Sequence, residues 1–241
     1  MSQLIKFVAL PLACSLLWAC SAPETKSPVE TPGRPESAKT QLLEAGAATL
    51  QAKPPIEDIN AYLDGFHFYN GHPDVQMEAH HYCSILNEDV IQCLVFDGNT
   101  KEAKIMGVEY IIDEKLFAGL PTNEKAMWHS HGYEVSSGQL VAPGIPATAE
   151  HALMERLAHT YGKTWHTWHT DQDKALPVGV PQLMMGFTMD GQADPALPAL
   201  NLVQPGTQLS SSRPRRLMSN SFAFGGNNIS LLLAETPGEH P

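Results

Sequence analysis

Residues 76–97 read QMEAHHYCSILNEDVIQCLVFD, and this stretch decides the fold. Two runs rich in aliphatic, aromatic and cysteine residues flank the turn-forming segment NED at residues 87–89, which is typical of a β-hairpin. In that register Cys83 lies directly opposite Cys93, where opposed Cβ atoms are about 4.5–5.5 Å apart. A disulfide between the two is therefore feasible. The alternative is that both are small buried apolar residues that stay unpaired.

Short strands and helices extend outward from this hairpin. The patterns predict strands at residues 76–86, 90–97, 103–112, 127–135, 139–141, 164–170 and 182–188. They predict helices at residues 37–51 with Ser37 as the cap, 56–63, 113–120 and 147–161, the last followed by Gly162. Because the element order is mixed and the connections are short, we expect an α+β fold: a single compact domain with a mainly antiparallel sheet and a few flanking helices.

The bulk composition limits the classes of partner. The 241 residues allow one domain with extensions, and a hydrophobic content of 43% is enough for a core. The formal net charge is −11. That charge disfavours nucleic acid, whose phosphates need a basic face, and it disfavours electrostatic docking on anionic lipid.

The first nineteen residues predict a secretory signal peptide. Lys6 supplies a positive start, and residues 7–18 form an apolar run too short to span a bilayer. The segment LWAC at residues 17–20 resembles a bacterial lipoprotein cleavage box, although its tryptophan departs from the usual small residue. The resemblance implies that Cys20 is acylated and anchored in membrane lipid. With Ser21 after it, the implied location is the bacterial cell envelope, at the outer membrane and facing the periplasm. The alternative is an ordinary secretory signal that leaves no anchor.

Between this box and the domain, residues 20–36 predict a lipidated Cys followed by a disordered tether. Pro23, Pro28, Pro32 and Pro35 stand among Ser, Thr, Glu and Gly, and aromatic residues are missing. Such a segment cannot bury a core. We therefore expect the folded domain to begin near residue 37.

Six of the eleven histidines fall in three short segments, HHYC at 80–83, WHSH at 128–131 and WHTWHT at 165–170. Alternate residues share one face of a strand, so His129 and His131 are expected to point the same way. One further imidazole, from His81, His80 or His166, would complete three ligands. Three protein ligands and an open position suit Zn²⁺ or another divalent ion.

The same segments allow other interpretations. The aromatic residues Trp128, Tyr133, Trp165 and Trp168 could line a pocket for a small ligand, and the histidines could be core residues that bind nothing. Glu134 follows the second histidine of WHSH by two intervening residues, fewer than in the first cupin motif, which puts it on the opposite face of a strand. The sequence assigns no catalytic residue, because Ser130 lacks the Gly-x-Ser-x-Gly surroundings of a nucleophile.

Taken in order, eight motifs resemble the oil body-associated protein family. They are FHFY at 66–69, EAHHYC at 78–83, QC at 92–93, GVEYII at 107–112, EKLF at 114–117, WHSH at 128–131, YGK at 161–163 and PQLMM at 181–185. The resemblance covers about residues 37–192. It implies a non-enzymatic accessory role at a lipid surface, since plant members are found on seed lipid droplets and affect droplet size and stability. It brings no established activity and therefore no catalytic residue. Those members act on the cytosolic side, so the family does not imply a disulfide.

The last residues follow another pattern. Residues 193–241 resemble the final strand and Gly-rich loop of a β-ketoacyl carrier-protein synthase. The nucleophile and catalytic histidines of that enzyme have no counterpart here, so no synthase activity and no independent fold are expected. Residues 229–233 would form an unpaired apolar strand, which either joins the sheet of the domain or remains poorly ordered.

Three hypotheses follow for the whole chain. The first is a membrane-anchored, non-enzymatic accessory protein at a lipid surface. The second is a His-ligated enzyme or binding protein for Zn²⁺ or another divalent metal. The third is a module that binds a small ligand between its aromatic residues.

Overall fold

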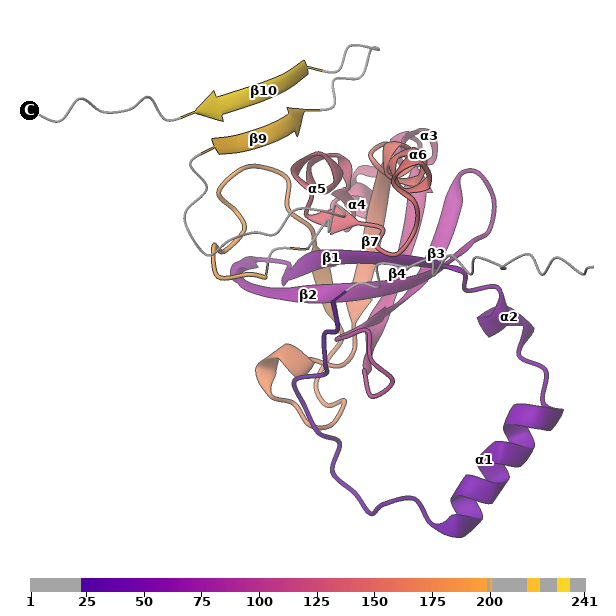
Figure 1. The fold of residues 1–241 in the computed structure, drawn as a ribbon. Coiled ribbons are helices and arrows are strands. Elements are labelled where there is room, and N and C mark those ends of the chain that lie inside the picture. The colour runs from indigo at the N-terminus through magenta and orange to yellow at the C-terminus, as the bar shows by residue number, and fades with distance from the viewer. Residues whose placement is uncertain (1–22, 199, 201–215, 222–228, 235–241) are drawn as a thin grey trace, which may run out of the picture.

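The computed structural model describes residues 23–198, 200, 216–221 and 229–234 (Figure 1). The predicted signal peptide, Cys20 and most of the synthase-like segment lie outside these residues. The predicted division of the chain at residues 19, 36 and 192 therefore stays a prediction.

At the centre is an antiparallel sheet that closes on itself (Figure 1). β1 (Ala61–Tyr69) pairs with β2 (His72–Ile85) along one side and with β8 (Gln182–Met185) along the other. The strands between are β3 (Val90–Phe96), β4 (Ile105–Asp113) and β7 (Thr160–His166), each paired with its neighbours. Two short strands add to this sheet, β5 (His129–Ser130) against β7 and β6 (Leu140–Val141) against β1.

The hairpin of β2 and β3 has the predicted register. Cys83 stands opposite Cys93, and a disulfide joins their sulfur atoms. Both residues are part of the main apolar cluster, which fills one end of the space inside the sheet. Its buried members are Leu63, Cys83, Ile91, Cys93, Ile111, Leu140, Ala142, Met154 and Leu157.

Four helices cover this end of the sheet (Figure 1). They are α3 (Glu114–Ala118), α4 (Thr122–Lys125), α5 (Gly132–Ser137) and α6 (Ala147–Leu157). Helix α6 buries Met154 and Leu157 in the apolar cluster, and a 3-10 turn follows β7 at Thr170–Gln172. The predicted antiparallel sheet is confirmed, but these helices are short, so the fold is mostly β rather than evenly α+β.

Four predicted elements differ from the structure. The strand expected at 164–170 is β7 at Thr160–His166, and Thr170 begins the 3-10 turn. Residues 61–63 belong to β1 rather than to a helix at 56–63. The strand expected at 127–135 is only two residues long, and helix α5 follows it at once. The helix expected at 147–161 ends at Leu157, and Gly162 lies inside β7 instead of ending a helix. At residues 61–63 and at Gly162 pairing with the sheet overrides the local helical pattern, whereas after Ser130 the chain leaves the sheet and turns into α5.

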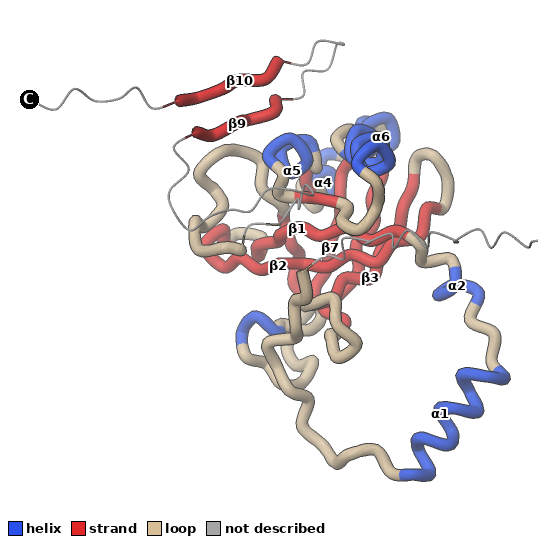
Figure 2. The backbone as a smooth tube through the Cα atoms, in the orientation of Figure 1, coloured by secondary structure: helices blue, strands red, loops and turns tan. Residues whose placement is uncertain are grey.

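The segment before the sheet has two distinct parts. Residues 23–29, here called the strap, lie against the outside of β2 and β3, where Ser27 Oγ hydrogen-bonds Asp97 Oδ2 at 2.7 Å and Val29 is buried. Part of the predicted tether is therefore docked on the domain. The chain then leaves the domain surface and forms α1 (Ala38–Leu50) and α2 (Pro54–Glu57), which lie away from the sheet (Figure 2). Ser37 caps α1 as predicted, and none of the residues of α1 is buried.

Near the C-terminus, β9 (Arg216–Ser221) and β10 (Ile229–Ala234) pair with each other in a separate two-stranded sheet. The apolar strand at 229–233 was expected to join the main sheet or to remain poorly ordered; in the structure it pairs with β9 instead. Among the helices that the structure describes, none combines the length and the apolar character needed to cross a membrane.

Candidate metal centre

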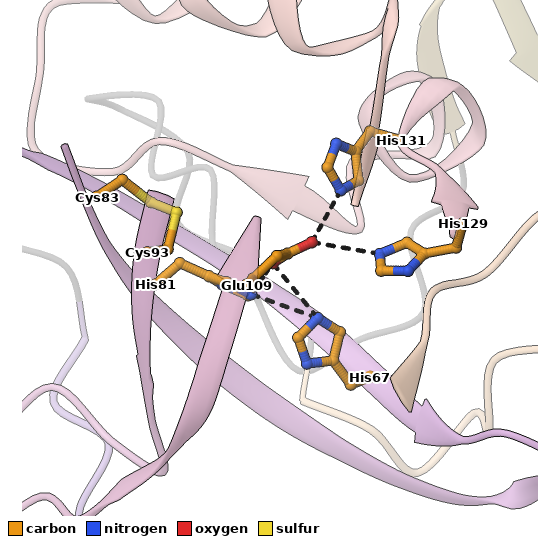
Figure 3. The surroundings of a disulfide bond; sticks show 7 residues. All are labelled: His67, His81, Cys83, Cys93, Glu109, His129 and His131. Carbon is orange, nitrogen blue, oxygen red and sulfur yellow. Dashed lines mark hydrogen bonds and ion pairs between the residues drawn. A yellow bond between two sulfur atoms is a disulfide. The ribbon is translucent and has the colours of Figure 1, made fainter. Parts of the chain in front are cut away.

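One carboxylate is enclosed by imidazoles inside the sheet (Figure 3). Glu109 lies on β4 and alternates with Gly107 and Ile111, so its side chain points to the interior, where it is only 2% exposed. The imidazoles that face it come from four separate places: His67 on β1, His81 on β2, His129 on β5 and His131 at the start of α5. All four histidines are buried.

The Nε2 atoms of these histidines converge on the two oxygens of Glu109. His81 Nε2 lies 2.8 Å and His67 Nε2 3.8 Å from Oε2. His131 Nε2 lies 3.2 Å and His129 Nε2 3.5 Å from Oε1. His81 and His67 also bring their Nε2 atoms within 3.3 Å of each other. Nitrogens this close, with their lone pairs directed at one point, are arranged as ligands of a common cation.

The hydrogen bonds of His131 determine which of its nitrogens carries the proton. Thr160 donates its only hydroxyl proton to the carbonyl of Leu157 at 2.7 Å, so its oxygen must accept from His131 Nδ1 at 2.8 Å. A neutral His131 therefore presents a bare Nε2 lone pair to the Glu109 carboxylate. Two acceptors 3.2 Å apart repel each other unless a proton or a metal ion lies between them.

A similar outer contact orients His67. Its Nδ1 lies 3.2 Å from His166 Nε2, which leaves His67 Nε2 free to face the centre of the site. An imidazole that donates through one nitrogen and ligates through the other is the usual arrangement at metal sites. Thr160 is thus the outer partner of the His131 imidazole, and His166 is the outer partner of the His67 imidazole.

The pKa shifts at the site favour the protonation states in which these side chains bind a metal. Burial lowers the pKa of His129 to about 3 and holds the pKa of His67 well below its ordinary value, so both are neutral at pH 7. Burial acts to raise the pKa of Glu109, but His81 and His131 outweigh it and hold that pKa well below the usual range. Neutral imidazoles and an ionised carboxylate are the ligand forms that bind divalent ions.

Glu134 adds a second carboxyl group beside His129. It lies on α5, 4.0 Å from His129 Nε2, and burial followed by the charge of Glu109 raises its pKa well above the ordinary value. The two neighbouring carboxyl groups therefore have pKa values shifted in opposite directions, that of Glu134 upward and that of Glu109 downward. Sequence spacing placed Glu134 on the face opposite His129, and this was wrong because the chain turns into a helix at Gly132.

The space between these groups fits a single ion. The cavity has a volume of about 10 Å³ and its lining includes no Lys or Arg; the lining residues are Leu63, Gly65, Phe66, His67, His81, Glu109, Ile111, His129, His131, Glu134 and Leu140. Two ligands about 2.1 Å from one ion, at angles of about 90–110°, are separated by about 3.0–3.4 Å. The measured separations around Glu109 run from 2.8 to 3.8 Å.

Two glycines make room for the carboxylates. A Cβ at Gly162, on β7, would overlap Glu109 Oε1 and lie 2.7 Å from His131 Nε2. A Cβ at Gly186 would approach both oxygens of Glu134 to 2.5 Å. The absence of a side chain at both positions is therefore a condition for the site.

The structure brings together three of the five histidines that the sequence proposes as ligands, His81, His129 and His131. His166 is buried behind His67 and contacts the site only through it. His80 points to the outer face of β2, as the alternation with His81 requires, and takes part in a different cluster.

The four aromatic residues proposed as a ligand pocket do not line this cavity and contact other groups. Trp128 donates to Glu124, Tyr133 donates to Asp190, and Trp168 donates to the carbonyl of Lys174. Trp165 is half-buried and points to the face of β7 opposite His166. These residues therefore do not belong to the interior cavity, and a ligand pocket built from them stays a prediction.

Sequence reasoning missed His67, Glu109 and the inward direction of Glu134. A usable signal exists for Glu109, because an acidic residue occupies an inward position of a strand whose other inward residues are apolar. His67 sits in a run of aromatic residues that masks it as a core position. No short-range pattern reveals Glu134, because its direction depends on α5.

Comparison with known proteins identifies a matching protein family and several similar proteins. Residues 53–217 match the family model described as "Protein of unknown function (DUF1264)", beginning and ending later than the resemblance noted at 37–192. Oil body-associated protein 1A of Zea mays is 48% identical over 164 residues, covering 68% of this chain and 69% of that protein. Oil body-associated protein 1B of Arabidopsis thaliana is 42% identical over 168 residues, covering 70% of each.

A third relative, oil body-associated protein 2A of Zea mays, is 39% identical over 165 residues, covering 68% of this chain and 64% of that protein. No solved structure matches the chain. The model match and the identities over two thirds of the sequence lead to one conclusion: the chain belongs to the oil body-associated protein family, a family of unknown molecular function (DUF1264).

Proposed function

We propose that this domain binds one divalent transition metal ion between Glu109 and the imidazoles of His67, His81, His129 and His131. The observation that carries the proposal is the convergence of four buried Nε2 atoms on one buried carboxylate, with no Lys or Arg lining the cavity. A buried carboxylate is costly without a compensating charge, and a divalent ion supplies it.

The ligand set narrows the choice of ion. Imidazole suits Zn, Fe, Ni and Cu, while carboxylate ligands also suit Mn. Five protein ligands exceed the four of a tetrahedral Zn²⁺ site and favour an ion that accepts five or six. Glu134, whose carboxyl pKa is raised by burial and then by the charge of Glu109, would lie beside the bound ion, next to His129. The small volume of the cavity supports metal binding rather than a reaction on a large substrate.

The test is elemental analysis of the full chain, purified without a His-tag and without chelator. We expect about one equivalent of one transition metal per chain, as the five-ligand set implies. Glu109→Gln and His131→Ala should lose the metal. His72→Ala is the matched control, because His72 is exposed on β2 and away from the site, and it should keep the metal. A folded wild-type chain that stays metal-free after incubation with Zn²⁺, Fe²⁺, Mn²⁺ and Ni²⁺ would refute the proposal.

A second candidate function, association with a lipid surface, is supported by α1. Leu42, Leu43 and Leu50 are 74%, 63% and 85% exposed, and Ile56 in α2 is exposed as well. Relatives of the chain carry the name oil body-associated. We propose that residues 38–57 lie on a lipid surface through these side chains. Acylation of Cys20, at the outer membrane of a bacterial envelope, is the predicted additional anchor.

Flotation with phosphatidylcholine vesicles tests this second candidate. Wild-type protein should float, and the triple variant Leu42→Ser/Leu43→Ser/Leu50→Ser should stay in solution. Glu44→Gln, a change on the same helix that removes no apolar side chain, is the control. Equal flotation of wild type and triple variant would refute the proposal that α1 binds the lipid surface. Mass analysis of the mature N-terminal peptide tests the acylation separately.

A further inference from the structure

A second group of ligand-type side chains lies on the opposite face of the sheet. Asp64 on β1 stands directly across from His80 on β2, and Glu78 is two residues before His80 on the same face. Their ligand atoms all lie within 4.8 Å of one another. His80 is 0% and Asp64 6% exposed, so this is a covered cluster rather than a set of surface acids.

The cluster contains polar atoms with no hydrogen-bond partner. His80 Nε2 and Asp64 Oδ1 are both buried and unpartnered. His80 Nε2 points toward Glu78 Oε1 at 3.6 Å, and His80 Nδ1 lies 3.4 Å from Asp64 Oδ1. Orphaned buried atoms of this kind cost free energy unless something binds them.

The charges in the cluster are also uncompensated. Among the residues that the structure describes, the ion pairs of Asp64 and Glu78 are with His80 alone, and no Lys or Arg lies within ion-pair distance of either carboxylate. Tyr62 fixes the imidazole by a hydrogen bond of 2.8 Å to His80 Nδ1, which directs His80 Nε2 toward Glu78. Two carboxylates and one oriented imidazole make a ligand set for a divalent cation.

The strap closes this cluster from outside. Thr25 donates its hydroxyl to Glu78 Oε1 at 3.2 Å, and its backbone N–H donates to Asn99 Oδ1 at 2.8 Å. The backbone N–H of Asn99 donates in return to the carbonyl of Thr25 at 2.9 Å. A Cβ at Gly98 would overlap that carbonyl oxygen, so the close approach of the strap depends on glycine there.

We propose that Asp64, Glu78 and His80 form a second divalent-cation site, closed by the strap and separate from the interior centre. The ion is one that accepts carboxylate and imidazole ligands together, such as Mn²⁺. It neutralises the two acids and occupies the unpartnered atoms of His80 and Asp64. Because Thr25 bonds a ligand of the ion, docking of the strap and binding of the ion support each other.

The experiment is a Mn²⁺ titration of the full chain followed by electron paramagnetic resonance of the free ion. It is done in a Glu109→Gln background, which removes the interior centre if that centre exists. We expect Glu109→Gln protein to bind one Mn²⁺ and the added substitution Glu78→Gln to abolish that binding. Adding Glu102→Gln instead removes one exposed carboxylate outside the cluster and should leave binding unchanged.

A second variant examines the strap. Gly98→Ala, again with Glu109→Gln, should weaken Mn²⁺ binding by about tenfold or more, because a ligand loses its outer partner. Since Glu78 is on the outer face and partly exposed, Glu78→Gln is expected to fold, which circular dichroism checks. The proposal is overturned if Glu109→Gln protein binds no Mn²⁺, or if Glu78→Gln or Gly98→Ala binds it as before. Neither result bears on the interior metal, which elemental analysis identifies as the metal that His131→Ala loses and Glu78→Gln keeps.

Discussion

A single hydroxyl group, that of Thr160, controls the orientation of a proposed metal ligand. It accepts from His131 Nδ1 while donating to the carbonyl of Leu157, so it holds the imidazole with Nε2 toward Glu109. Thr160→Val keeps the shape and removes this contact, and we expect the affinity for the metal to fall by about 10–100-fold. Competition with a chelator of known affinity measures the metal affinity of the variant and of the wild type.

Thr164 provides the matched control for that substitution. It is fully buried on the same strand, β7, but its hydroxyl has no hydrogen-bond partner. Thr164→Val should therefore leave the metal affinity unchanged. Equal loss of affinity in both variants would show that Thr160 acts through packing and not through His131.

Buried imidazoles give the metal-free protein a defined pH dependence. Burial lowers the pKa of His129 and of His166 to about 3, whereas an unfolded chain has a His pKa of about 6.5. As pH falls from about 6.5 toward 3, the unfolded state gains protons that the folded state does not. Each such histidine then lowers the free energy of unfolding by up to about 1.4 kcal/mol per pH unit.

Urea unfolding of chelated protein at several pH values between 4 and 7, an interval chosen from those ordinary and lowered pKa values, measures this slope. His166→Gln should show a smaller loss of stability on acidification than wild type. His72→Gln, at an exposed position, should match wild type. Identical slopes in all three proteins would contradict a lowered pKa at His166.

The candidate site was only partly predictable at this scale. The sequence proposed His129 and His131 as a pair on one strand face, and they do meet at the site, although His131 lies at the start of α5 and not in a strand. It proposed His81 only as one of three alternatives with His80 and His166, because alternation shows that His80 and His81 face opposite ways but not which of them faces inward. His67 and Glu109 become ligands only when β1 and β4 are brought together around the closed sheet. That meeting depends on strand pairings across the whole chain, which a local pattern does not contain.

Among the elements, the hairpin of β2 and β3 carries a covalent link. The Cys83–Cys93 disulfide closes a loop with a sequence separation of 10 residues. In the chain-entropy account, a loop of this size stabilises the fold by about 3 kcal/mol. We expect the Cys83→Ala/Cys93→Ala double variant to unfold at lower urea, and reductant to shift wild type but not the variant. An unchanged midpoint in the variant would contradict a stabilising role.

The hairpin also shows how far elements can be predicted. Its two strands alternate over many residues around a clear turn, so their register is readable from sequence. The sequence of β1 has no comparable alternation, because Asp64 and His67 occupy buried positions in the two polar clusters. Strands bearing buried polar groups break the apolar pattern on which prediction relies.

At the scale of the whole molecule, the interior site connects distant parts of the sheet. Its proposed ligands come from β1, β2, β4, β5 and the start of α5. An ion bound there stabilises the entire domain, by about 2.7 kcal/mol when its free concentration is 100 times the dissociation constant. For a domain of this size that corresponds to about 5–10 °C in melting temperature.

Calorimetry with and without chelator measures that effect. Chelation should lower the melting temperature of the wild type in a single transition, because the ligands belong to one cooperative sheet. Protein with both Glu109→Gln and Glu78→Gln, which lacks both proposed sites, should be insensitive to chelator. A wild-type melting temperature that does not change on chelation would contradict the coupling of metal and fold.

The docked strap also sets how far the domain can reach from an anchor at Cys20. Thr25 is the fifth residue after Cys20, and Ala61, the first residue of β1, is the forty-first. At about 3.5 Å per extended residue and about 1.5 Å per residue of α1 and α2, the chain covers at most about 18 Å over the shorter interval and about 110 Å over the longer one. If Cys20 is acylated, as the sequence predicts, a docked strap keeps the domain within about 18 Å of its anchor. Release of the strap extends that distance roughly sixfold, and with it the area of lipid around the anchor that the domain can reach.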